Sequence, residues 1–531
     1  MKKQEEEILA KLSPFEVKNK LIELVNNQHN HSMINAGRGN PDWVATKPRY
    51  AFFQLGLFAL EESTLQFSGY EGFGGIAQKE GIEKRFNDFV EKNKNTEGII
   101  YLKEYFDFAV STYNLGKDDL LIEWVNGIIG DNYPMPDRML VNSEIIVREY
   151  LMQEMGAKNV ELNGKFDVFA VEGGTAAMVY IFNTLKANKF LNAGDTIAIG
   201  APIFTPYIEM PELKDYDLKI VEINSDENNG WQYPDSEIEK LKDPKIKAFF
   251  LVNPMNPPSV KLNEESLDKI AAIAKERGDL ILLTDDVYGT FTNNFTSLAM
   301  KAPEQTILVY SYSKYFGATG WRLGTIALHE NNMFDKMLAN LSKEDKTELH
   351  ERYKAMTMDP EGVKMIDRFV ADSRAVALNH TAGLSTPQQI QMVMFSLAAL
   401  SDIKNQYKDD SKKIVKERYD ALIEGEENPL IASNDPNGAF YYILVDVLKQ
   451  ATEKYGEEFA KWMSENYNSL DPVIRYAEEK GVVAMPGGGF DGPEWTLRFS
   501  LANSSAETFR EVRKLGYQIL EGYYQEYKVN N

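Results

Sequence analysis

Between about residues 166 and 330, short apolar runs alternate with longer stretches in which apolar residues recur every three or four positions. The short runs include FDVFAV, TIAIGAP, KIKAFFLVNP, LILLTDD and TILVYSYS, and the longer ones include GTAAMVYIFNTLKA and ESLDKIAAIAKERG. Strands that are apolar on both faces and separated by amphipathic helices predict a mainly parallel sheet flanked by helices, an α/β fold. Because ligands of such sheets bind at the carboxyl ends of the strands, we expect the chemistry where each run stops.

Two other stretches have helical spacing and no strand signal between the helices. They cover about residues 69–131 and a charge-rich region at about 331–373, and we predict that both are helical insertions. After residue 400, long helices alternate with a few strands such as GAFYYILVDV and WTLRFSL, which indicates a smaller α+β domain. We therefore predict an N-terminal segment (1–49) that belongs to the small domain, a large domain (50–400) and a C-terminal small domain (401–531).

The composition narrows the possible partners. The chain has 58 basic and 80 acidic residues and a net charge of −22, the wrong sign for binding nucleic acid or an anionic membrane. An acidic N-terminus and the absence of a long apolar run predict a cytoplasmic protein. The sequence has no cysteine, which excludes thiolate metal sites and a cysteine nucleophile. We expect no metal, because the five histidines lack ligand spacing: His29, His31, His329, His350 and His380.

The segment SYSKYFGATGWRLGTIAL, residues 311–328, carries the strongest chemical signal. Ser311 and Ser313 precede Lys314 at a strand end, and Arg322 follows among glycines. A lysine held at a strand end can form a Schiff base, and an arginine nearby can bind a phosphate with two parallel hydrogen bonds. A lone lysine in a Ser/Gly loop is more often a surface residue, whereas this combination indicates a phosphorylated aldehyde cofactor.

This segment resembles the cofactor-lysine signature of the aspartate aminotransferase family, the fold type I enzymes that use pyridoxal 5′-phosphate. Further motifs follow in the family's order. In VEGGTAAM, Gly173, Gly174 and Thr175 stand where a strand meets a helix, and the resemblance implies that they cradle the cofactor phosphate. In APIFTPYIEM, it implies that Phe204 stacks on the cofactor ring.

Two more motifs complete the implied cofactor site. LVNPMNPPSV keeps Asn256, which would donate to the phenolic oxygen, although Pro258 and Ser259 stand where the family usually has Thr and Gly. In LILLTDDVYGTF, the resemblance implies that Asp285 pairs with the pyridine nitrogen and that Tyr288 also contacts the cofactor. Without that context, an aspartate at a strand end would more often be a turn or cap residue.

The same resemblance extends to a second subunit and to the substrate. NYPMPDRML looks like the family's Tyr-Pro segment, so Tyr133 would reach the cofactor phosphate of a neighbouring subunit in a homodimer with shared active sites. GGGFDGPEWTLRFSLAN places Arg498 where the family binds the substrate α-carboxylate.

The remaining features narrow the resemblance. The N-terminal segment with NAGRGNPDW, the two helical insertions and the length of 531 residues resemble the bifunctional aspartate 4-decarboxylases, which also act as aspartate aminotransferases. This implies conversion of L-aspartate to L-alanine and CO₂, transamination with 2-oxo acids, and assembly of dimers into a dodecamer. It also implies that Arg38, Gly39 and Lys18 face the substrate, although a solvated helix position is an equal alternative for Lys18.

Two other function classes remain as alternatives. An aminotransferase of another amino acid would share every cofactor residue and would lack only the insertions. A non-catalytic regulator on this fold would normally carry a basic DNA-binding helix pair, and the acidic N-terminus offers none. The motifs do not decide between decarboxylation and transamination, because that choice depends on how the site holds the β-carboxylate and excludes water.

Overall fold

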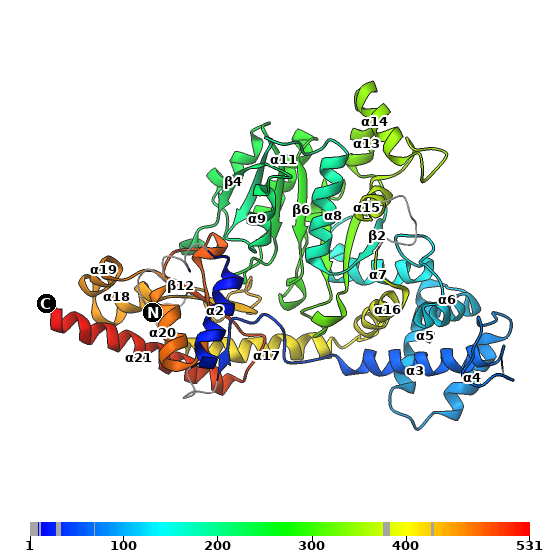
Figure 1. Cartoon of the computed structure of the whole chain (residues 1–531), viewed down its shortest axis with the longest axis horizontal. Helices are drawn as coiled ribbons and strands as arrows, with labels where there is room; N and C mark the ends of the chain where they lie inside the picture. The colour runs from blue at the N-terminus through cyan, green and yellow to red at the C-terminus, as the bar shows by residue number, and fades with distance from the viewer. Residues whose placement is uncertain are drawn as a thin grey trace.

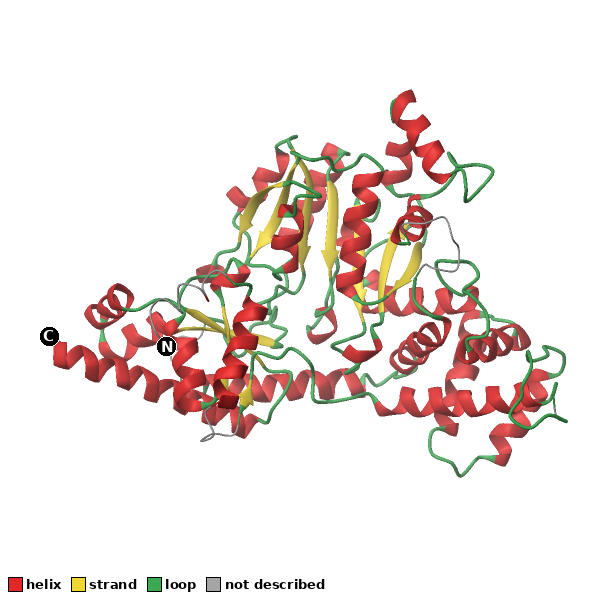
Figure 2. Cartoon of the chain, viewed as in Figure 1, coloured by secondary structure: helices red, strands yellow, loops and turns green. Residues whose placement is uncertain are grey.

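A computed structural model describes Leu9 and residues 12–27, 33–67, 69–374, 383–425 and 430–530. A large sheet lies in the middle of the molecule, with a small sheet towards one end and a group of helices at the other (Figures 1 and 2). Within the described residues, no helix is long and apolar enough to span a membrane. Three of the five histidines, His29, His31 and His380, lie outside the described residues.

The central sheet has seven strands in the order β2-β8-β7-β6-β5-β3-β4. Neighbouring strands are parallel except at β8, which runs antiparallel to β2 and β7, so the predicted mainly parallel α/β fold is confirmed. The sequence did not predict β4, an edge strand in which only Ile223 is buried, because it lacks an apolar run. The strands are β2 (Phe166–Val171), β3 (Thr196–Ala201), β4 (Lys219–Asn224), β5 (Ile246–Val252), β6 (Ile281–Asp285), β7 (Thr306–Ser311) and β8 (Gly324–His329).

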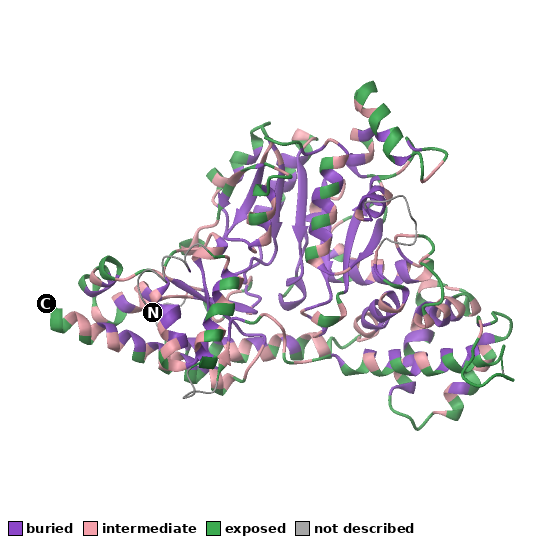
Figure 3. Ribbon diagram, in the orientation of Figure 1, coloured by how far each residue is buried: buried purple, intermediate pink, exposed green. Residues whose placement is uncertain are grey.

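Both faces of this sheet are buried. In β5, Phe250 packs in the core that includes helix α8 (Gly174–Ala187), and its neighbour Phe249 packs in the core that includes α11 (Glu264–Arg277). Successive strand residues point to opposite faces, so covering both faces requires the continuous apolar runs seen in the sequence. Figure 3 shows the resulting buried strands between partly exposed helices. Three other helices lie along this region of the chain: α9 (Pro206–Glu212), α10 (Asp235–Ile238) and α12 (Leu298–Lys301).

The small sheet has the order β11-β12-β9, and the N-terminal segment packs beside it. Helix α2 (Pro14–Asn27) packs against α20 (Asp471–Lys480), and β1 (Ile34–Asn35) pairs in parallel with β10 (Val482–Val483). This arrangement favours the predicted assignment of residues 1–49 to the small domain, while the boundaries stay predictions. The other elements are α17 (Gln406–Ile423), β9 (Tyr442–Asp446), α18 (Val447–Tyr455), α19 (Glu457–Asn466), β11 (Met485–Pro486), β12 (Thr496–Ser500) and α21 (Ala506–Asn530).

The two predicted insertions are helical over most of their length. The first contains α4 (Ile82–Lys92), α5 (Ile99–Tyr113) and α6 (Lys117–Ile129), but residues 69–81 form no helix because glycines at 69, 72, 74 and 75 disfavour it. The second contains α13 (Met333–Ala339), α14 (Lys343–Tyr353) and α15 (Met365–Ser373). Neighbouring helices are α3 (Thr46–Thr64), α7 (Val141–Glu154) and α16 (Thr386–Leu400).

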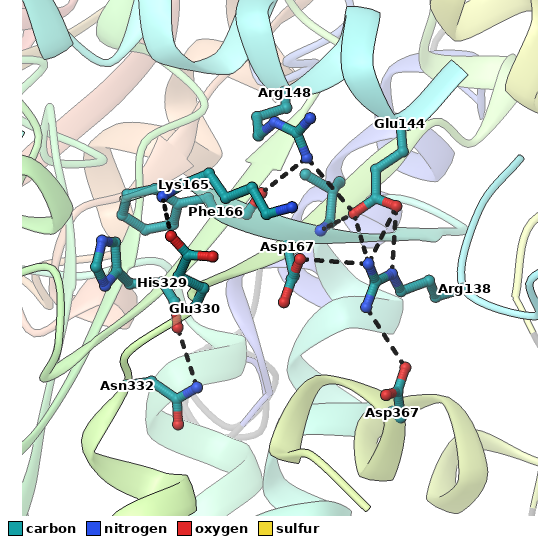
Figure 4. A network of polar contacts seen from close by, with 11 residues as sticks. Arg138, Glu144, Arg148, Lys165, Phe166, Asp167, His329, Glu330, Asn332 and Asp367 are labelled. Atoms are coloured by element: carbon teal, nitrogen blue, oxygen red, sulfur yellow. Dashed lines mark hydrogen bonds and ion pairs between the residues drawn. The ribbon is translucent and has the colours of Figure 1, made fainter. Parts of the chain in front are cut away.

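A polar network fixes the segment 132–140 against the edge of the central sheet. The Arg138 guanidinium lies 3.2 Å from Glu144 of α7, 3.3 Å from Asp167 of β2 and 3.6 Å from Asp367 of α15 (Figure 4). One largely buried arginine thus joins three elements, and it neutralises the carboxylates of Glu144 and Asp167, which would be costly to bury without a cationic partner. The network holds the Tyr-Pro segment in place on the outside of the large domain.

Candidate active site

A cavity of about 460 Å³ lies at the carboxyl ends of the parallel strands and is closed by the N-terminal segment and the small sheet. This is the position that the α/β pattern predicts for a ligand. The cavity brings together all the predicted site residues except Gly173 and Tyr133. The predicted residues that line the cavity are Lys18, Arg38, Gly39, Gly174, Thr175, Phe204, Asn256, Asp285, Tyr288, Ser311, Ser313, Lys314, Arg322 and Arg498.

One end of the cavity has the donors that a phosphate group requires. Gly174 and Thr175 form the first turn of α8, a 14-residue helix whose N-terminus attracts an anion. The hydroxyl oxygens of Ser311 and Ser313 lie 2.9 Å apart beside it. Arg322 completes this end, and none of the described carboxylates forms an ion pair with it. These groups fit the phosphate of the predicted cofactor.

Gly173 acts on this end from outside the cavity. Its φ of 89° lies in the left-handed region that favours glycine, and a Cβ atom there would clash with Nη2 of Arg322. Arg322 itself has a φ of 54° and donates to the carbonyl oxygens of Thr319 at 2.9 Å and Glu172 at 3.1 Å. Glycine at 173 therefore leaves the space in which the guanidinium is held.

The carboxylate of Asp285 lies deeper, at the last residue of β6. It accepts hydrogen bonds from the Tyr207 hydroxyl at 3.2 Å and from the backbone N–H of Val287 at 3.3 Å. Burial raises the pKa of Asp285 to about 6, and these two hydrogen bonds and the positive charge of Lys314 oppose that shift. A buried carboxylate of this kind fits a cationic ring nitrogen, which would favour its charged form.

The N-terminal segment crosses directly over Lys314. The Lys314 ammonium donates to the carbonyl oxygen of Gly39 at 3.2 Å, and Asn40 donates to the Thr319 hydroxyl at 3.1 Å. A Cβ atom on Gly39 would lie 2.5 Å from the Tyr442 hydroxyl oxygen and 3.4 Å from Nζ of Lys314. Only glycine leaves room for this close approach.

Arg498 in β12 is only 2% exposed, and its hydrogen-bond partners among the described residues are all neutral. It donates to Oδ1 of Asn256 and to the carbonyl oxygen of Gly37, each at 3.1 Å, and its Nε–H has no hydrogen-bond partner among the described residues. The guanidinium carbon lies 4.4 Å from the ring centre of Tyr442 and 4.7 Å from that of Phe490. Burial lowers its pKa, so a bound carboxylate would relieve an uncompensated charge.

Two further cations come from the N-terminal segment. Lys18 is half-buried on α2, and burial followed by the positive charge of Arg498 lowers its pKa, with Arg38 adding to the effect and Glu16 opposing it. Arg38 lies at the mouth of the cavity. The lining then has five cationic side chains and one acidic side chain. A protein with a net charge of −22 thus concentrates positive charge where an anionic ligand would bind.

The departure from the family motif at Ser259 has a structural role. Ser259 has a φ of 64°, which explains why glycine is usual at this position. Its hydroxyl accepts the backbone N–H groups of Tyr441 at 2.9 Å and Tyr442 at 3.2 Å. The loop that holds Asn256 is thereby bonded to the start of β9, which a glycine at 259 would not do.

Sequence reasoning missed several residues of the cavity, and one predicted residue besides Gly173 lies apart from it. The missed residues are Phe15, Gly37, Asn40, Val252, Val287, Thr319, Gly320 and Tyr442. For most of them, the only signal in the sequence is that they stand close to a recognised motif. Tyr133 is 66% exposed and lines a separate depression with Met135, so its role towards a neighbouring subunit stays a prediction.

Three comparisons agree with this site. The family model of class I and II aminotransferases matches residues 146–514. A bifunctional aspartate aminotransferase and L-aspartate beta-decarboxylase from a Pseudomonas species is 48% identical over 523 residues, 98% of each chain. An aspartate aminotransferase from Pyrococcus horikoshii is 26% identical and covers 64% of this chain and 72% of its own.

The fold comparison extends to solved structures. An aspartate aminotransferase double mutant from Thermus thermophilus superposes with a TM-score of 0.61 at 17% identity over 96% of each chain, which shows the shared fold. The family's enzymes use pyridoxal 5′-phosphate, so the cofactor prediction is confirmed. The chain belongs to the class I and II aminotransferases, in the group that includes the bifunctional aspartate aminotransferase and L-aspartate beta-decarboxylase.

Proposed function

We propose that the chain catalyses β-decarboxylation of L-aspartate to L-alanine and CO₂, with accompanying transamination between aspartate and 2-oxoglutarate. The observation that carries this proposal is the single cavity in which the cofactor residues of the sheet meet Lys18, Arg38 and Arg498. The near full-length similarity to the bifunctional Pseudomonas enzyme supports it, because that match includes the N-terminal segment and both helical regions.

The residues of the cavity have distinct proposed roles towards pyridoxal 5′-phosphate. When bound, this cofactor supplies an aldehyde for covalent attachment and an aromatic ring that accepts electrons. Asp285 would hold a proton on the ring nitrogen, Asn256 would donate to the phenolic oxygen, and Phe204 would cover one face of the ring. The phosphate would be held by the first turn of α8, the two serine hydroxyls and Arg322.

Lys314 would move the proton in the first chemical step. Its Nζ donates to the carbonyl oxygen of Gly39, and its side chain lines the cavity together with the cofactor residues and the three substrate cations. As a neutral amine at this position, Lys314 would take the proton from the substrate Cα and return it to a different atom. Tyr288 and Ser313 line the same part of the cavity.

The substrate carboxylates would bind at different cations. Arg498 would bind the α-carboxylate with two parallel hydrogen bonds, since its buried guanidinium has no described carboxylate partner. Lys18 and Arg38 would meet the β-carboxylate. Burial and the positive charge of Arg498 lower the pKa of Lys18, and Arg38 adds to the effect, so a bound carboxylate would favour the charged form of this lysine.

We also propose a homodimer with shared active sites, assembled further into a dodecamer. Tyr133 and Met135 are 66% and 73% exposed, as expected for side chains that reach a neighbouring subunit. The outer face of α3 presents a second exposed apolar surface, which would suit contact with another copy. It comprises Tyr50, Phe53, Leu57 and Leu60. A cytoplasmic location stays a prediction.

The proposed reaction can be tested with purified protein, pyridoxal 5′-phosphate, L-aspartate and a catalytic amount of pyruvate. Decarboxylation predicts CO₂ release and alanine in excess of the pyruvate added. Oxaloacetate formed only in proportion to the 2-oxo acid would instead support an aminotransferase without decarboxylase activity. A Lys314→Ala variant measured in parallel gives the background.

A further inference from the structure

Tyr442, the first residue of β9, contacts both halves of the cavity. Its hydroxyl oxygen lies 2.9 Å from the hydroxyl oxygen of Tyr288, a proposed cofactor residue. Its ring lies 4.4 Å from the guanidinium carbon of Arg498, the proposed ligand of the α-carboxylate. The side chain is only 3% exposed, and that exposed part belongs to the lining of the cavity.

The hydroxyl pair leaves one donor free. Burial raises the pKa of Tyr288 well above its ordinary value, and the nearby hydroxyls of Tyr442 and Tyr441 raise it further, so Tyr288 stays neutral. The hydroxyl oxygens of Tyr288 and Tyr442 lie 2.9 Å apart, and the hydrogen bond between them uses one hydroxyl hydrogen. The hydrogen of the other hydroxyl is available for a hydrogen bond to a ligand in the cavity. The bond between the two hydroxyls fixes the direction in which this hydrogen points.

The position of Tyr442 is tightly fixed. The Ser259 hydroxyl accepts its backbone N–H, and its hydroxyl oxygen would lie 2.5 Å from a Cβ atom on Gly39, the residue whose carbonyl holds Nζ of Lys314. Glycine at 39 is thus what allows the tyrosine hydroxyl and the lysine amine to lie side by side. No side chain larger than hydrogen fits between them.

We propose that Tyr442 is a positioning residue that couples the cofactor to the substrate carboxylate. Its ring supports the Arg498 guanidinium, and its hydroxyl orients the Tyr288 hydroxyl in the cavity that Lys314 also lines. This inference rests on the proposed function, because it assigns a role within the same cavity. The ring of Tyr442 would affect substrate binding, and its hydroxyl would affect the cofactor.

The two parts can be removed one at a time. Tyr442→Phe removes the hydroxyl and keeps the ring against Arg498. Phe490→Leu is the matched control, because the Phe490 ring also contacts this guanidinium, at 4.7 Å, and has no hydroxyl. Tyr442→Leu removes both parts. Thermal unfolding of all three variants reports whether each remains folded.

The first measurement is the pH titration of the visible absorbance of the lysine-bound cofactor, made without substrate. A hydroxyl donor stabilises the more negative form of the group it serves, so loss of the hydrogen bond that orients the Tyr288 donor should raise the midpoint in Tyr442→Phe by about 0.5 pH unit or more. Phe490→Leu should leave the midpoint within about 0.2 pH unit of the wild type. Tyr442→Leu should match Tyr442→Phe.

The second measurement is the dissociation constant of succinate, a dicarboxylate without a reactive amine. It should weaken about fivefold or more in Phe490→Leu and Tyr442→Leu, which lose a ring against the guanidinium, and less than about threefold in Tyr442→Phe. An unchanged midpoint in Tyr442→Phe, or equal patterns in Tyr442→Phe and Phe490→Leu, would overturn the coupling role. A wild-type protein without visible lysine-bound absorbance would instead refute the proposed function.

Discussion

The cofactor half and the substrate half of the cavity are built in different ways. The cofactor half consists of residues at the ends of neighbouring strands of one sheet, such as Asp285 at the end of β6 and Lys314 after β7. The substrate half consists of Lys18 from α2, Arg38 from the loop that follows β1, and Arg498 from β12. Strand register fixes the first set, whereas the second depends on packing between distant parts of the chain.

Hydrogen bonds between distant segments help to assemble the substrate half. The backbone N–H of Ser500 donates to the carbonyl oxygen of Ala36 at 2.6 Å, and Arg498 donates to Gly37. Asn503 donates to the carbonyl oxygen of Arg38. A family can therefore keep one cofactor half and change its substrate by altering the segments that close over it. Substitutions in one half should therefore have effects that can be measured separately from those in the other half.

Lys314→Ala should have the largest effect. Loss of the amine removes both the covalent attachment and the proton transfer, so activity should fall at least about 10⁴-fold and the visible absorbance of the lysine-bound cofactor should disappear. Absorbance spectroscopy and product assays measure the two losses. Lys18→Met is the matched control from the substrate half and should keep the absorbance. Covalent cofactor that persists in Lys314→Ala would contradict the assignment.

Asp285→Asn should lower activity by about 10³-fold and yet stabilise the cofactor-free protein. The pKa of Asp285 is raised to about 6, so ionisation carries a penalty that is absent below about pH 4, its unfolded value, and complete above about pH 6. At pH 8 the variant should gain about 2 to 3 kcal/mol in the free energy of unfolding, and near pH 4 nothing. Denaturant unfolding of both cofactor-free proteins at the two pH values measures this.

Asp286→Asn is the matched control for that trade-off. Asp286 is also buried, with its pKa raised to about 7, but it does not line the cavity and accepts a hydrogen bond from Thr284. This substitution should also stabilise the cofactor-free protein at pH 8, while retaining at least about tenfold more activity than Asp285→Asn. Equal activity losses in the two variants would place the role of Asp285 in doubt.

Arg498→Lys should weaken substrate binding and leave cofactor binding unchanged. A lysine cannot form two parallel hydrogen bonds with a carboxylate, so kcat/KM for aspartate should fall about 10²-fold, mainly through KM, with the cofactor absorbance retained. Steady-state kinetics tests this. Arg475→Lys, in which the arginine instead pairs with Asp471 and Glu526 outside the cavity, should change KM less than about twofold. A loss of cofactor absorbance in Arg498→Lys would show that the halves are not separable.

The difference between the halves also explains which site residues the sequence predicts. Asp285, Asn256 and Lys314 stand in short motifs at strand ends, so the alternation of strands and helices is enough to predict that they share one site. Tyr442 belongs to an apolar run with the pattern of a core strand. No feature of the neighbouring sequence indicates that its hydroxyl lies next to Gly39. Contacts between distant segments are not encoded in local spacing.

Two differences between the predicted and the observed secondary structure have similarly local causes. The pattern does not predict strand β4, because an edge strand with one buried residue has no continuous apolar run. It extends the first helical insertion over residues 69–81, although their glycines disfavour a helix. Neither difference touches the site, because both regions lie away from the carboxyl ends of β5, β6 and β7.

The central claim is that the substrate half decides between decarboxylation and transamination, and Arg38→Gln tests it most directly. With L-[4-¹³C]aspartate and limiting 2-oxo acid, the ratio of ¹³CO₂ to oxaloacetate should change about tenfold between wild type and variant, because the cation beside the β-carboxylate is lost. The absorbance of the lysine-bound cofactor should not change. An unaltered product ratio, with both products reduced equally, would contradict the account.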